Sequence, residues 1–175
     1  MKNIVLVGFM GTGKTTIGTA LARRLEMTYI STDNLIEKRE KSTINEIFSK
    51  RGEDYFRDVE SSVIRDISCR DGLVVDTGGG VVIRDDNMAL LRSNGVVISL
   101  TADADTILER TKKYKHRPLL NVEDPKRKVK ELLDKRAPLY AKAGHEIDTG
   151  KLTVRQVIDQ IVKIAKEEGA VKEDA

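Results

Sequence analysis

The 175-residue sequence contains no tryptophan, only one cysteine and three prolines, and aromatic residues make up just 4% of it. The single cysteine, Cys69, cannot form an internal disulfide, which is consistent with a reducing compartment. We expect its small side chain to lie in the core. Because aromatic side chains are scarce, the chain offers few platforms on which nucleic-acid bases could stack.

Long apolar runs are also missing. No stretch stays apolar for the roughly 18 residues that a membrane-spanning helix needs. Near the start, the apolar run after Lys2 is broken by glycines and by Lys14, too early for the core of a signal peptide. We therefore expect a cytoplasmic protein without a membrane partner.

The net charge is only +3, although charged residues make up 34% of the chain. Acids and bases interleave along most of its length, which gives no support to a nucleic-acid partner. The densest basic stretches are KKYKHRPLL and PKRKVKELLDKR, within residues 112–136. We interpret them as a local site for phosphate groups.

Five short apolar runs rich in β-branched residues alternate with amphipathic stretches of helical length. The runs are residues 3–9, 28–31, 73–76, 95–100 and 145–148. This alternation predicts an α/β fold of three layers, in which helices cover both faces of a parallel sheet of about five strands.

The chain shows no linker or repeat that would divide it. We expect residues 1–168 to form one domain and residues 169–175 to form a loose polar tail. The last expected helix follows Thr153, a residue type typical of helix N-caps. Its apolar stripe consists of Val154, Val157, Ile158, Ile161, Ile164 and Ala165.

The segment GFMGTGKTT, residues 8–16, follows the first expected strand and satisfies the pattern G-x-x-x-x-G-K-[ST]. Glycines also make tight turns without a ligand, but Lys14 and Thr15 at this spacing favour a nucleoside triphosphate. Lys14 is expected to reach the β- and γ-phosphates, and the Thr15 hydroxyl to bind Mg²⁺. Backbone N–H groups and the N-terminus of the next helix should hold the β-phosphate. The other residues expected around the nucleotide are Gly8, Gly11, Thr12, Gly13 and Thr16.

Ligands of open α/β sheets bind beyond the carboxyl ends of the strands. Asp33, Asp76 and the glycines that follow Asp76 stand at such ends. These residues are therefore candidates for the acceptor side of the site.

Several segments, taken in order, resemble the shikimate kinase family: the P-loop, STDNLIE, GEDYFRDVE, DTGGGVV, HRPLL and KRAPLY. The resemblance covers residues 2–166. It implies the P-loop fold of the nucleoside monophosphate kinases, with a substrate-binding helical region at about residues 33–62 and a lid at about residues 112–124. The implied reaction is transfer of the γ-phosphate of ATP, with Mg²⁺, to the 3-hydroxyl of shikimate in aromatic amino-acid biosynthesis.

The resemblance also implies roles for individual residues. Asp33 would receive the acceptor hydroxyl and orient its oxygen toward the γ-phosphate. From the sequence alone, Asp33 could equally cap the helix that follows it. Arg57 and Arg136 match arginines that hold the shikimate carboxylate, for which paired guanidinium forks are suited. Glu60 lies three residues after Arg57 and should hold that side chain in place.

Two further arginines match residues near the nucleotide. Arg110 resembles a residue beside the adenine. Arg117 resembles a lid arginine that neutralises charge on the transferring phosphoryl group, and closure of the lid would exclude water. We expect the lid to be mobile without ligand and ordered when both substrates are bound. The expected catalytic residues are thus Lys14, Asp33 and Arg117.

The remaining residues implied by the resemblance would surround the substrate. Three consecutive glycines would let the polyol ring and the γ-phosphate approach the backbone. They are Gly78, Gly79 and Gly80. Apolar side chains would form one wall of the pocket, namely Ile44, Phe48, Phe56, Pro118 and Leu119.

The chain departs from the family pattern at Ser31, where the family has an acid that reaches Mg²⁺ through water. We expect Asp76 to face Thr15 and to take over this task by holding a metal-bound water. The alternative is that Asp76 is an ordinary polar residue at the end of a strand.

Three functions remain open from the sequence. The first is a monomeric shikimate kinase whose partners are ATP and shikimate. The second is a kinase of the same fold with another acceptor, such as gluconate or a nucleoside monophosphate. The third is a regulatory nucleotide-binding protein that has lost transfer. The two carboxylate-binding arginines and the triple glycine favour the first, and only Ser31 favours the third.

Overall fold

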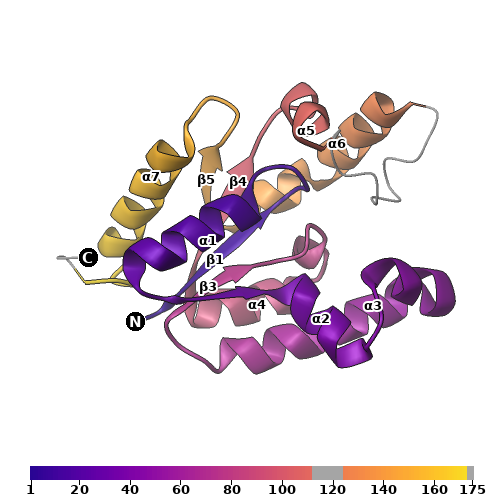
Figure 1. Cartoon of the computed structure of the whole chain (residues 1–175), viewed down its shortest axis with the longest axis horizontal. Coiled ribbons are helices and arrows are strands. Elements are labelled where there is room, and N and C mark those ends of the chain that lie inside the picture. Colours follow the sequence, from indigo (N-terminus) through magenta and orange to yellow (C-terminus); the bar gives the residue numbers. More distant parts are fainter. Residues whose placement is uncertain (112–123, 173–175) are drawn as a thin grey trace.

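A parallel sheet of five strands runs through the centre of the protein (Figure 1). The structure is a computed structural model, and it describes residues 1–111 and 124–172. The strand order is β2-β3-β1-β4-β5, and all neighbouring pairs are parallel. The strands are β1 (Asn3–Gly8), β2 (Thr28–Ser31), β3 (Leu73–Asp76), β4 (Gly95–Thr101) and β5 (His145–Asp148). All five predicted strands are confirmed.

Helices connect the strands and account for most of the remaining described residues. They are α1 (Lys14–Leu25), α2 (Thr32–Glu40), α3 (Ile44–Ser68), the short 3₁₀ helix η1 (Val81–Ile83), α4 (Asp85–Ser93), α5 (Ala104–Thr111), α6 (Pro125–Ala143) and α7 (Val154–Glu167). Among the described residues, no helix has both the length and the apolar character needed to cross a bilayer.

The side chains of β1 alternate between two apolar cores, one on each face of the sheet. Leu6 belongs to the core beneath α1 and α7, where Ile161 is fully buried. Val5 belongs to the core beneath α3, α4 and α6, which contains Val129. Figure 1 shows α1 and α7 on one side of the sheet and α4 on the other. The predicted three-layer arrangement is therefore confirmed.

Helices α2 and α3 build a smaller apolar cluster of their own beside the sheet. Ser31 is the N-cap of α2, and its Oγ accepts a hydrogen bond from the backbone N–H of Asn34 at 3.3 Å. The alternative in which Asp33 caps this helix is therefore wrong. Within α3 the backbone leaves the helical conformation at Gly52, with φ 82° and ψ 175°, so the helix consists of two segments.

Two expectations about the surface are wrong. Cys69 is exposed, because α3 ends at Ser68 and its buried face ends at Ile67. Ala170 and Val171 are buried in the core, although they belong to the segment expected to be a polar tail. The chain turns back at Gly169, where φ is 62°.

The turn at Gly169 has the hydrogen bonds of a Schellman motif. The N–H of Ala170 donates to the carbonyl of Ala165 at 2.7 Å, and the N–H of Gly169 donates to the carbonyl of Lys166 at 2.9 Å. These bonds satisfy two terminal carbonyls of α7 and return an apolar pair to the core.

The amphipathic pattern of α7 predicted its packing with one exception. Val157, Ile158, Ile161 and Ala165 are buried and Ile164 packs against the core, whereas Val154 in the first turn is 43% exposed. The predicted N-cap is confirmed. Thr153 Oγ1 accepts from the N–H of Gln156 at 3.3 Å, and the Gln156 side chain accepts from the N–H of Thr153 at 2.9 Å.

We expect Thr153→Ala to lower the free energy of unfolding by about 1 kcal/mol, because two N–H groups at the start of α7 depend on this reciprocal cap. Urea denaturation measures the change. Thr153→Ser keeps the hydroxyl and should retain most of the stability. Equal stability of the alanine variant and the unsubstituted protein would contradict the importance of the cap.

Candidate active site

The P-loop forms a tight turn between β1 and α1 at the carboxyl edge of the sheet. Its backbone has positive φ at Gly8, Gly11 and Gly13, and Gly13 is the N-cap residue of α1. Lys14 Nζ folds back over the turn and donates hydrogen bonds to the carbonyls of Gly8 at 2.9 Å and Phe9 at 3.1 Å. The loop thus has the backbone shape that a phosphate group requires, with a lysine ammonium at its mouth.

Thr12 anchors the P-loop from within. Its side chain is buried, and Oγ1 donates to the carbonyl of Phe9 at 2.8 Å. The Thr12 carbonyl accepts at 2.9 Å from the hydroxyl of Thr149, which follows β5. Thr16, by contrast, is exposed on the first turn of α1.

A hydrogen-bonded cluster joins α1, β2 and β3 beside the P-loop. Thr15 Oγ1 donates to Asp76 Oδ2 at 2.7 Å, and the Tyr29 hydroxyl donates to the same oxygen at 2.9 Å. Burial raises the pKa of Tyr29 well above its ordinary value, and the charge of Asp76 adds to this effect. The tyrosine is therefore a neutral donor, and the prediction that Asp76 faces Thr15 is confirmed.

The donor atoms of this cluster suit Mg²⁺, which prefers hard oxygen ligands. Thr15 Oγ1 keeps its lone pairs, and Asp76 keeps its second carboxylate oxygen. The described residues contain no group of three or more acidic, histidine or cysteine side chains placed so that they could hold a metal ion. A cation here would therefore complete its ligand shell with water and phosphate oxygens.

Ser31 lies beside Asp76 in the sheet, since the two residues are paired in register across β2 and β3. Ser31 lines the same cavity as Asp76, while its hydroxyl accepts from Asn34 at the start of α2. The serine therefore has a structural task that keeps its side chain at the edge of the sheet.

Asp33 and Glu60 approach one another on either side of Gly78. A Cβ atom on Gly78 would lie 2.7 Å from Asp33 Oδ1 and 3.1 Å from Glu60 Oε1, so any side chain here would displace the carboxylates. The backbone N–H of Gly78 donates to Thr32 Oγ1 at 3.1 Å. This bond fixes the glycine turn against the first residue of the helix that carries Asp33.

Arg57 is held between two glutamates on α3. Its Nη1 donates to Glu60 Oε2 at 2.8 Å, while Nη2 and Nε lie 3.1 and 3.3 Å from Glu53 Oε1. Glu60 is fully buried, and burial raises its pKa while the Arg57 charge acts in the opposite direction. The predicted contact between Arg57 and Glu60 is confirmed. A Cβ atom on Gly80 would overlap the Arg57 guanidinium, so the glycine turn lies directly against it.

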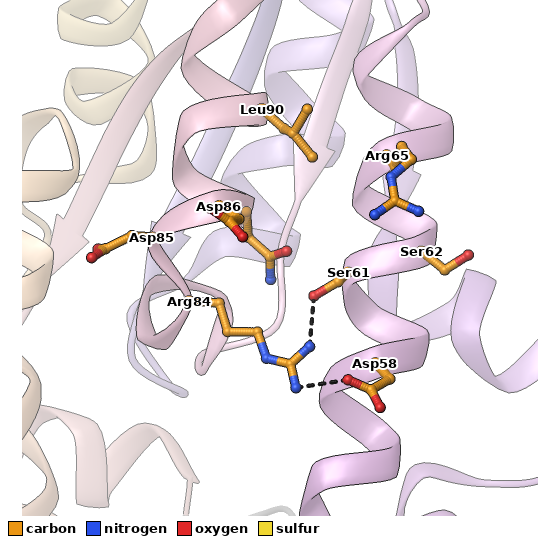
Figure 2. Close-up of a pocket in the computed structure, with 9 residues that line it drawn as sticks. Asp58, Ser61, Ser62, Arg65, Arg84, Asp85, Asp86 and Leu90 are labelled. Carbon is orange, nitrogen blue, oxygen red and sulfur yellow. Dashed lines mark hydrogen bonds and ion pairs between the residues drawn. The ribbon is translucent and has the colours of Figure 1, made fainter.

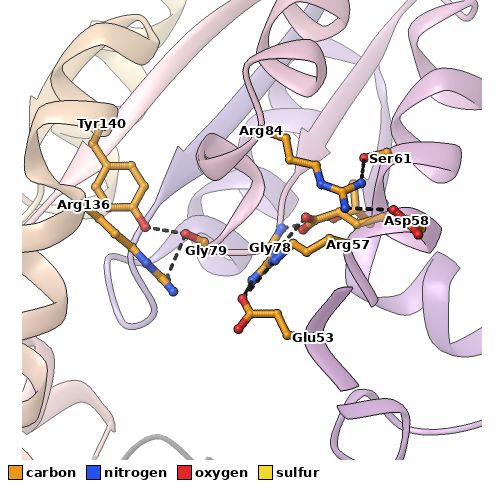
Figure 3. Close-up of polar contacts among 11 residues, drawn as sticks. Glu53, Arg57, Asp58, Ser61, Gly78, Gly79, Arg84, Arg136 and Tyr140 are labelled. Carbon is orange, nitrogen blue, oxygen red and sulfur yellow. Dashed lines mark hydrogen bonds and ion pairs between the residues drawn. The ribbon is translucent and has the colours of Figure 1, made fainter. Parts of the chain in front are cut away.

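Arg136 and Tyr140 reach the glycine turn from α6 (Figure 3). The buried Tyr140 donates its hydroxyl to the carbonyl of Gly79 at 2.5 Å, and Arg136 Nη1 lies 3.4 Å from the same oxygen. The two arginines, Arg57 and Arg136, thus lie on opposite sides of the segment Gly78–Gly80 in the figure, one from α3 and one from α6.

A cavity of about 270 Å³ connects the P-loop to the ends of β2 and β3. It brings together Lys14, Thr15, Asp33, Asp76 and Gly79, five of the residues that the sequence singled out. The described residues that line it are Met10, Gly11, Gly13, Lys14, Thr15, Tyr29, Ser31, Asp33, Asn34, Asp76, Thr77 and Gly79.

Arg110 lies at the opposite side of the P-loop, on α5. Its Nη2 donates to the carbonyl of Thr149 at 2.8 Å and its Nη1 to the Thr149 hydroxyl at 3.0 Å, with the Gly11 carbonyl at 3.4 Å. Arg110 and Thr149 therefore tie the P-loop to the chain that follows β5.

The expected apolar wall is present in part. Phe56 is buried within the cluster of α2 and α3, Ile44 packs against that cluster, and the Phe48 ring lies 4.7 Å from the Phe56 ring. Phe48 is 36% exposed, so it forms the outer edge of this wall. Arg117, Pro118 and Leu119, together with most of the expected lid, lie outside the described residues.

Five residues with polar contacts at the site were not singled out from the sequence: Tyr29, Thr32, Glu53, Tyr140 and Thr149. Tyr29 and Thr32 flank Ser31 in the stretch already considered, so their positions at the end of β2 were a usable signal. Tyr140 ends the KRAPLY segment. Thr149 directly follows β5, but no local pattern distinguished it from an ordinary strand end.

Comparison with known proteins supports one family. The profile described as shikimate kinase matches residues 10–166. A shikimate kinase of Thermodesulfovibrio yellowstonii is 50% identical over 163 residues, which cover 93% of this chain and 94% of that protein. A second relative, from Caldanaerobacter subterraneus, is 45% identical over 93% of this chain and 95% of its own length.

Solved structures agree with the sequence comparisons. The shikimate kinase of Acinetobacter baumannii in complex with shikimate superposes with a TM-score of 0.90 and 37% identity, covering 96% of this chain and 94% of that one. Sequence and fold therefore both show that the chain belongs to the shikimate kinase family.

Proposed function

We propose that the chain transfers the γ-phosphoryl group of ATP to the 3-hydroxyl of shikimate in the cavity between the P-loop and Asp33. The observation that supports this best is the placement of Asp33 beside Gly78, with Lys14 and Thr15 lining the same cavity. The solved relative from A. baumannii holds shikimate, which supports the same acceptor for this chain.

The P-loop would bind the triphosphate. Lys14 now donates to two carbonyls of its own loop, and its ammonium can exchange these acceptors for the β- and γ-phosphate oxygens. Because the loop is fixed through Thr12 and Thr149, the exchange requires movement of the lysine side chain alone. Gly11, Gly13 and Thr16 would surround the phosphates, and Arg110 would lie beside the adenine.

Asp33 would position the acceptor. Its carboxylate can accept a hydrogen bond from the 3-hydroxyl and direct the oxygen toward the phosphorus atom, which brings the reacting groups together. A side chain at residue 78 would crowd this carboxylate, because a Cβ atom on Gly78 would lie 2.7 Å from Asp33 Oδ1. Asp33 thus acts as the orienting group and the acceptor of the hydroxyl proton.

Arg57 and Arg136 would bind the substrate carboxylate. A guanidinium has five N–H donors, and the two glutamates accept from three nitrogens of Arg57. Each Nη group therefore retains a donor for the carboxylate. Glu60 holds the guanidinium in a fixed position, so less side-chain entropy is lost when the substrate binds. Ile44, Phe48 and Phe56 would supply the apolar wall.

Thr15 and Asp76 would hold Mg²⁺, Asp76 through a water molecule. When bound, Mg²⁺ neutralises charge on the β- and γ-phosphate oxygens. The carboxylate at residue 76 compensates for the missing acid at Ser31, because it lies beside Ser31 and within 2.7 Å of the Thr15 hydroxyl.

The proposal also includes residues 112–124 as a lid, with Arg117 neutralising the transferring phosphoryl group and Pro118 and Leu119 facing the substrate. We further propose that the enzyme is a monomer and that it is cytoplasmic. The single cysteine cannot form an internal disulfide, which is consistent with a reducing compartment.

The reaction itself is the first test. Purified protein with ATP, Mg²⁺ and shikimate should form ADP and shikimate 3-phosphate in equal amounts, measured by coupled assay and by phosphorus NMR. Gluconate and nucleoside monophosphates serve as control acceptors. ATP binding without acceptor-dependent turnover would indicate a regulatory protein, and turnover with a control acceptor alone would indicate another kinase.

Arg57→Ala and Arg136→Ala should each raise the KM for shikimate by about 10- to 100-fold, because each removes charged hydrogen bonds to the carboxylate. The KM for ATP should change far less. Arg51→Ala is the matched control, since Arg51 lies on α3 over the Tyr55 ring and outside the cavity. Equal effects on both substrates would refute the carboxylate assignment.

Asp76→Ala should raise the Mg²⁺ concentration needed for half-maximal rate by about 10- to 100-fold and lower kcat, since a group that orients the metal-bound water is lost. Adding Ser31→Asp should restore part of the loss by returning an acid to the neighbouring strand. Tyr29→Phe, which removes a donor but keeps the carboxylate, is the control. An Asp76→Ala enzyme with normal Mg²⁺ dependence would rule out compensation.

A further inference from the structure

A second cavity, of about 570 Å³, lies between α3 and α4 (Figure 2). It shares no lining residue with the 270 Å³ cavity at the P-loop. One wall comes from a single face of α3, with residues at helical spacing. The other comes from the start of α4. The residues are Asp58, Ser61, Ser62 and Arg65 on α3, and Arg84, Asp85, Asp86, Asn87 and Leu90 at α4.

Asn87 lines this cavity with a side chain that has no partner. The residue is 1% exposed, and neither Nδ2 nor Oδ1 forms a hydrogen bond with any other described residue. A buried amide without partners costs folding free energy, and native structures rarely keep one without a reason. Because the amide offers both a donor and an acceptor, it matches a ligand that carries both.

Five charged residues line the cavity: Arg84 and Asp58 form an ion pair, whereas Arg65, Asp85 and Asp86 are exposed to solvent. Arg84 Nη2 donates to Asp58 Oδ1 at 2.8 Å and its Nη1 to Ser61 Oγ at 3.1 Å, which joins the two walls at one end. Arg65 and Asp86 form no ion pair or side-chain hydrogen bond with the other described residues. Their charges are opposite, and Figure 2 shows them on facing walls, whereas Asp85 points away from α3.

The hydroxyl groups add little binding capacity. Ser61 accepts from Arg84, and Ser62 accepts from Arg39 Nη1 at 2.9 Å. Among the described residues, Leu90 is the only apolar one in the lining. The cavity therefore selects for charge and hydrogen bonding more than for an apolar group.

We propose that this cavity binds a free α-amino acid. Its carboxylate would bind the Arg65 guanidinium and its ammonium would bind the Asp86 carboxylate. The Asn87 amide, whose nitrogen and oxygen are buried in the free protein, would turn toward the ligand to donate to the first and accept from the second. Both charged side chains are exposed, and a zwitterion is the ligand that can bind the two at once, whereas a molecule with one charge can bind only one of them. The side chain of the amino acid would extend past Leu90 toward solvent.

The inference does not depend on the proposed phosphoryl transfer. Arg57 and Glu60, which belong to the candidate active site, lie in the same stretch of α3 as Asp58 and Ser61. Figure 3 shows Arg57, Asp58 and Ser61 on this stretch. Arg57 and Glu60 are not among the described residues that line this cavity, and neither takes part in the contacts proposed for the amino acid. Binding can therefore be measured without turnover.

The test uses the full-length protein and the common protein L-amino acids as probes, each in thermal-shift and isothermal titration experiments. At least one should bind with a stoichiometry of one and raise Tm. Three analogues of the amino acid that binds should bind at least about tenfold more weakly, because each loses a charged contact. They are its N-acetyl amide, the analogue without the amine and the analogue without the carboxylate. If an analogue with one charge bound as tightly as the amino acid, the inference that the cavity binds a zwitterion would be wrong.

Three variants test the residues. Arg65→Gln, Asp86→Asn and Asn87→Leu should each weaken binding by at least about tenfold. Arg155→Gln on α7, an exposed arginine outside the cavity, should leave it unchanged. In the free protein, Asn87→Leu should raise Tm, since it removes an amide without partners.

A variant that is more stable but no longer binds would separate the role of Asn87 in binding from a role in folding. If Asn87→Leu fails to fold, the two charge variants decide the question. Unchanged affinity in both charge variants, or no binding of any amino acid to the unsubstituted protein at millimolar concentration, would refute the proposal.

Discussion

The parallel pairing of β1 with β3 on one side and β4 on the other brings the functional groups to one edge of the sheet. Register places Leu6 beside Asp76 and Gly8 beside Leu100, so the P-loop begins where its neighbours end. The Thr15 hydroxyl then lies within hydrogen-bond distance of Asp76. If this register shifted by one residue, Asp76 would face the other side of the sheet and the P-loop would lose its carboxylate.

The same register shows which carboxylate lies beside Ser31 in the sheet, the position at which the family pattern has an acid. Neighbouring strands lie about 4.8 Å apart, and Asp76 is the sheet neighbour of Ser31. The Asp76 carboxylate therefore lies one strand away from Ser31, within hydrogen-bond distance of the Thr15 hydroxyl. The serine that remains caps α2, the helix that carries Asp33. In the proposed mechanism, metal handling and acceptor positioning would therefore be divided between the ends of two neighbouring strands.

The strands, the P-loop and the contact between Arg57 and Glu60 could be predicted because each depends on short-range spacing. The contact between Thr15 and Asp76 required only the expected strand order. Other features depend on distant segments. Tyr140 and Gly79 lie 61 positions apart, and no periodicity indicates their hydrogen bond. The burial of Ala170 depends on one turn at Gly169, and the exposure of Cys69 depends on where α3 ends.

The central place of β1 has a consequence for synthesis of the chain. β1 is made first, yet β3 begins only at Leu73 and β4 at Gly95. All six residues of β1 are buried in the finished sheet, so this apolar strand leaves the ribosome long before either neighbour exists. Unpaired apolar strand edges promote association between chains. The arrangement that places the phosphate loop at the centre of the sheet therefore leaves the growing chain more open to association with other chains than the folded protein, in which β3 and β4 cover both edges of β1.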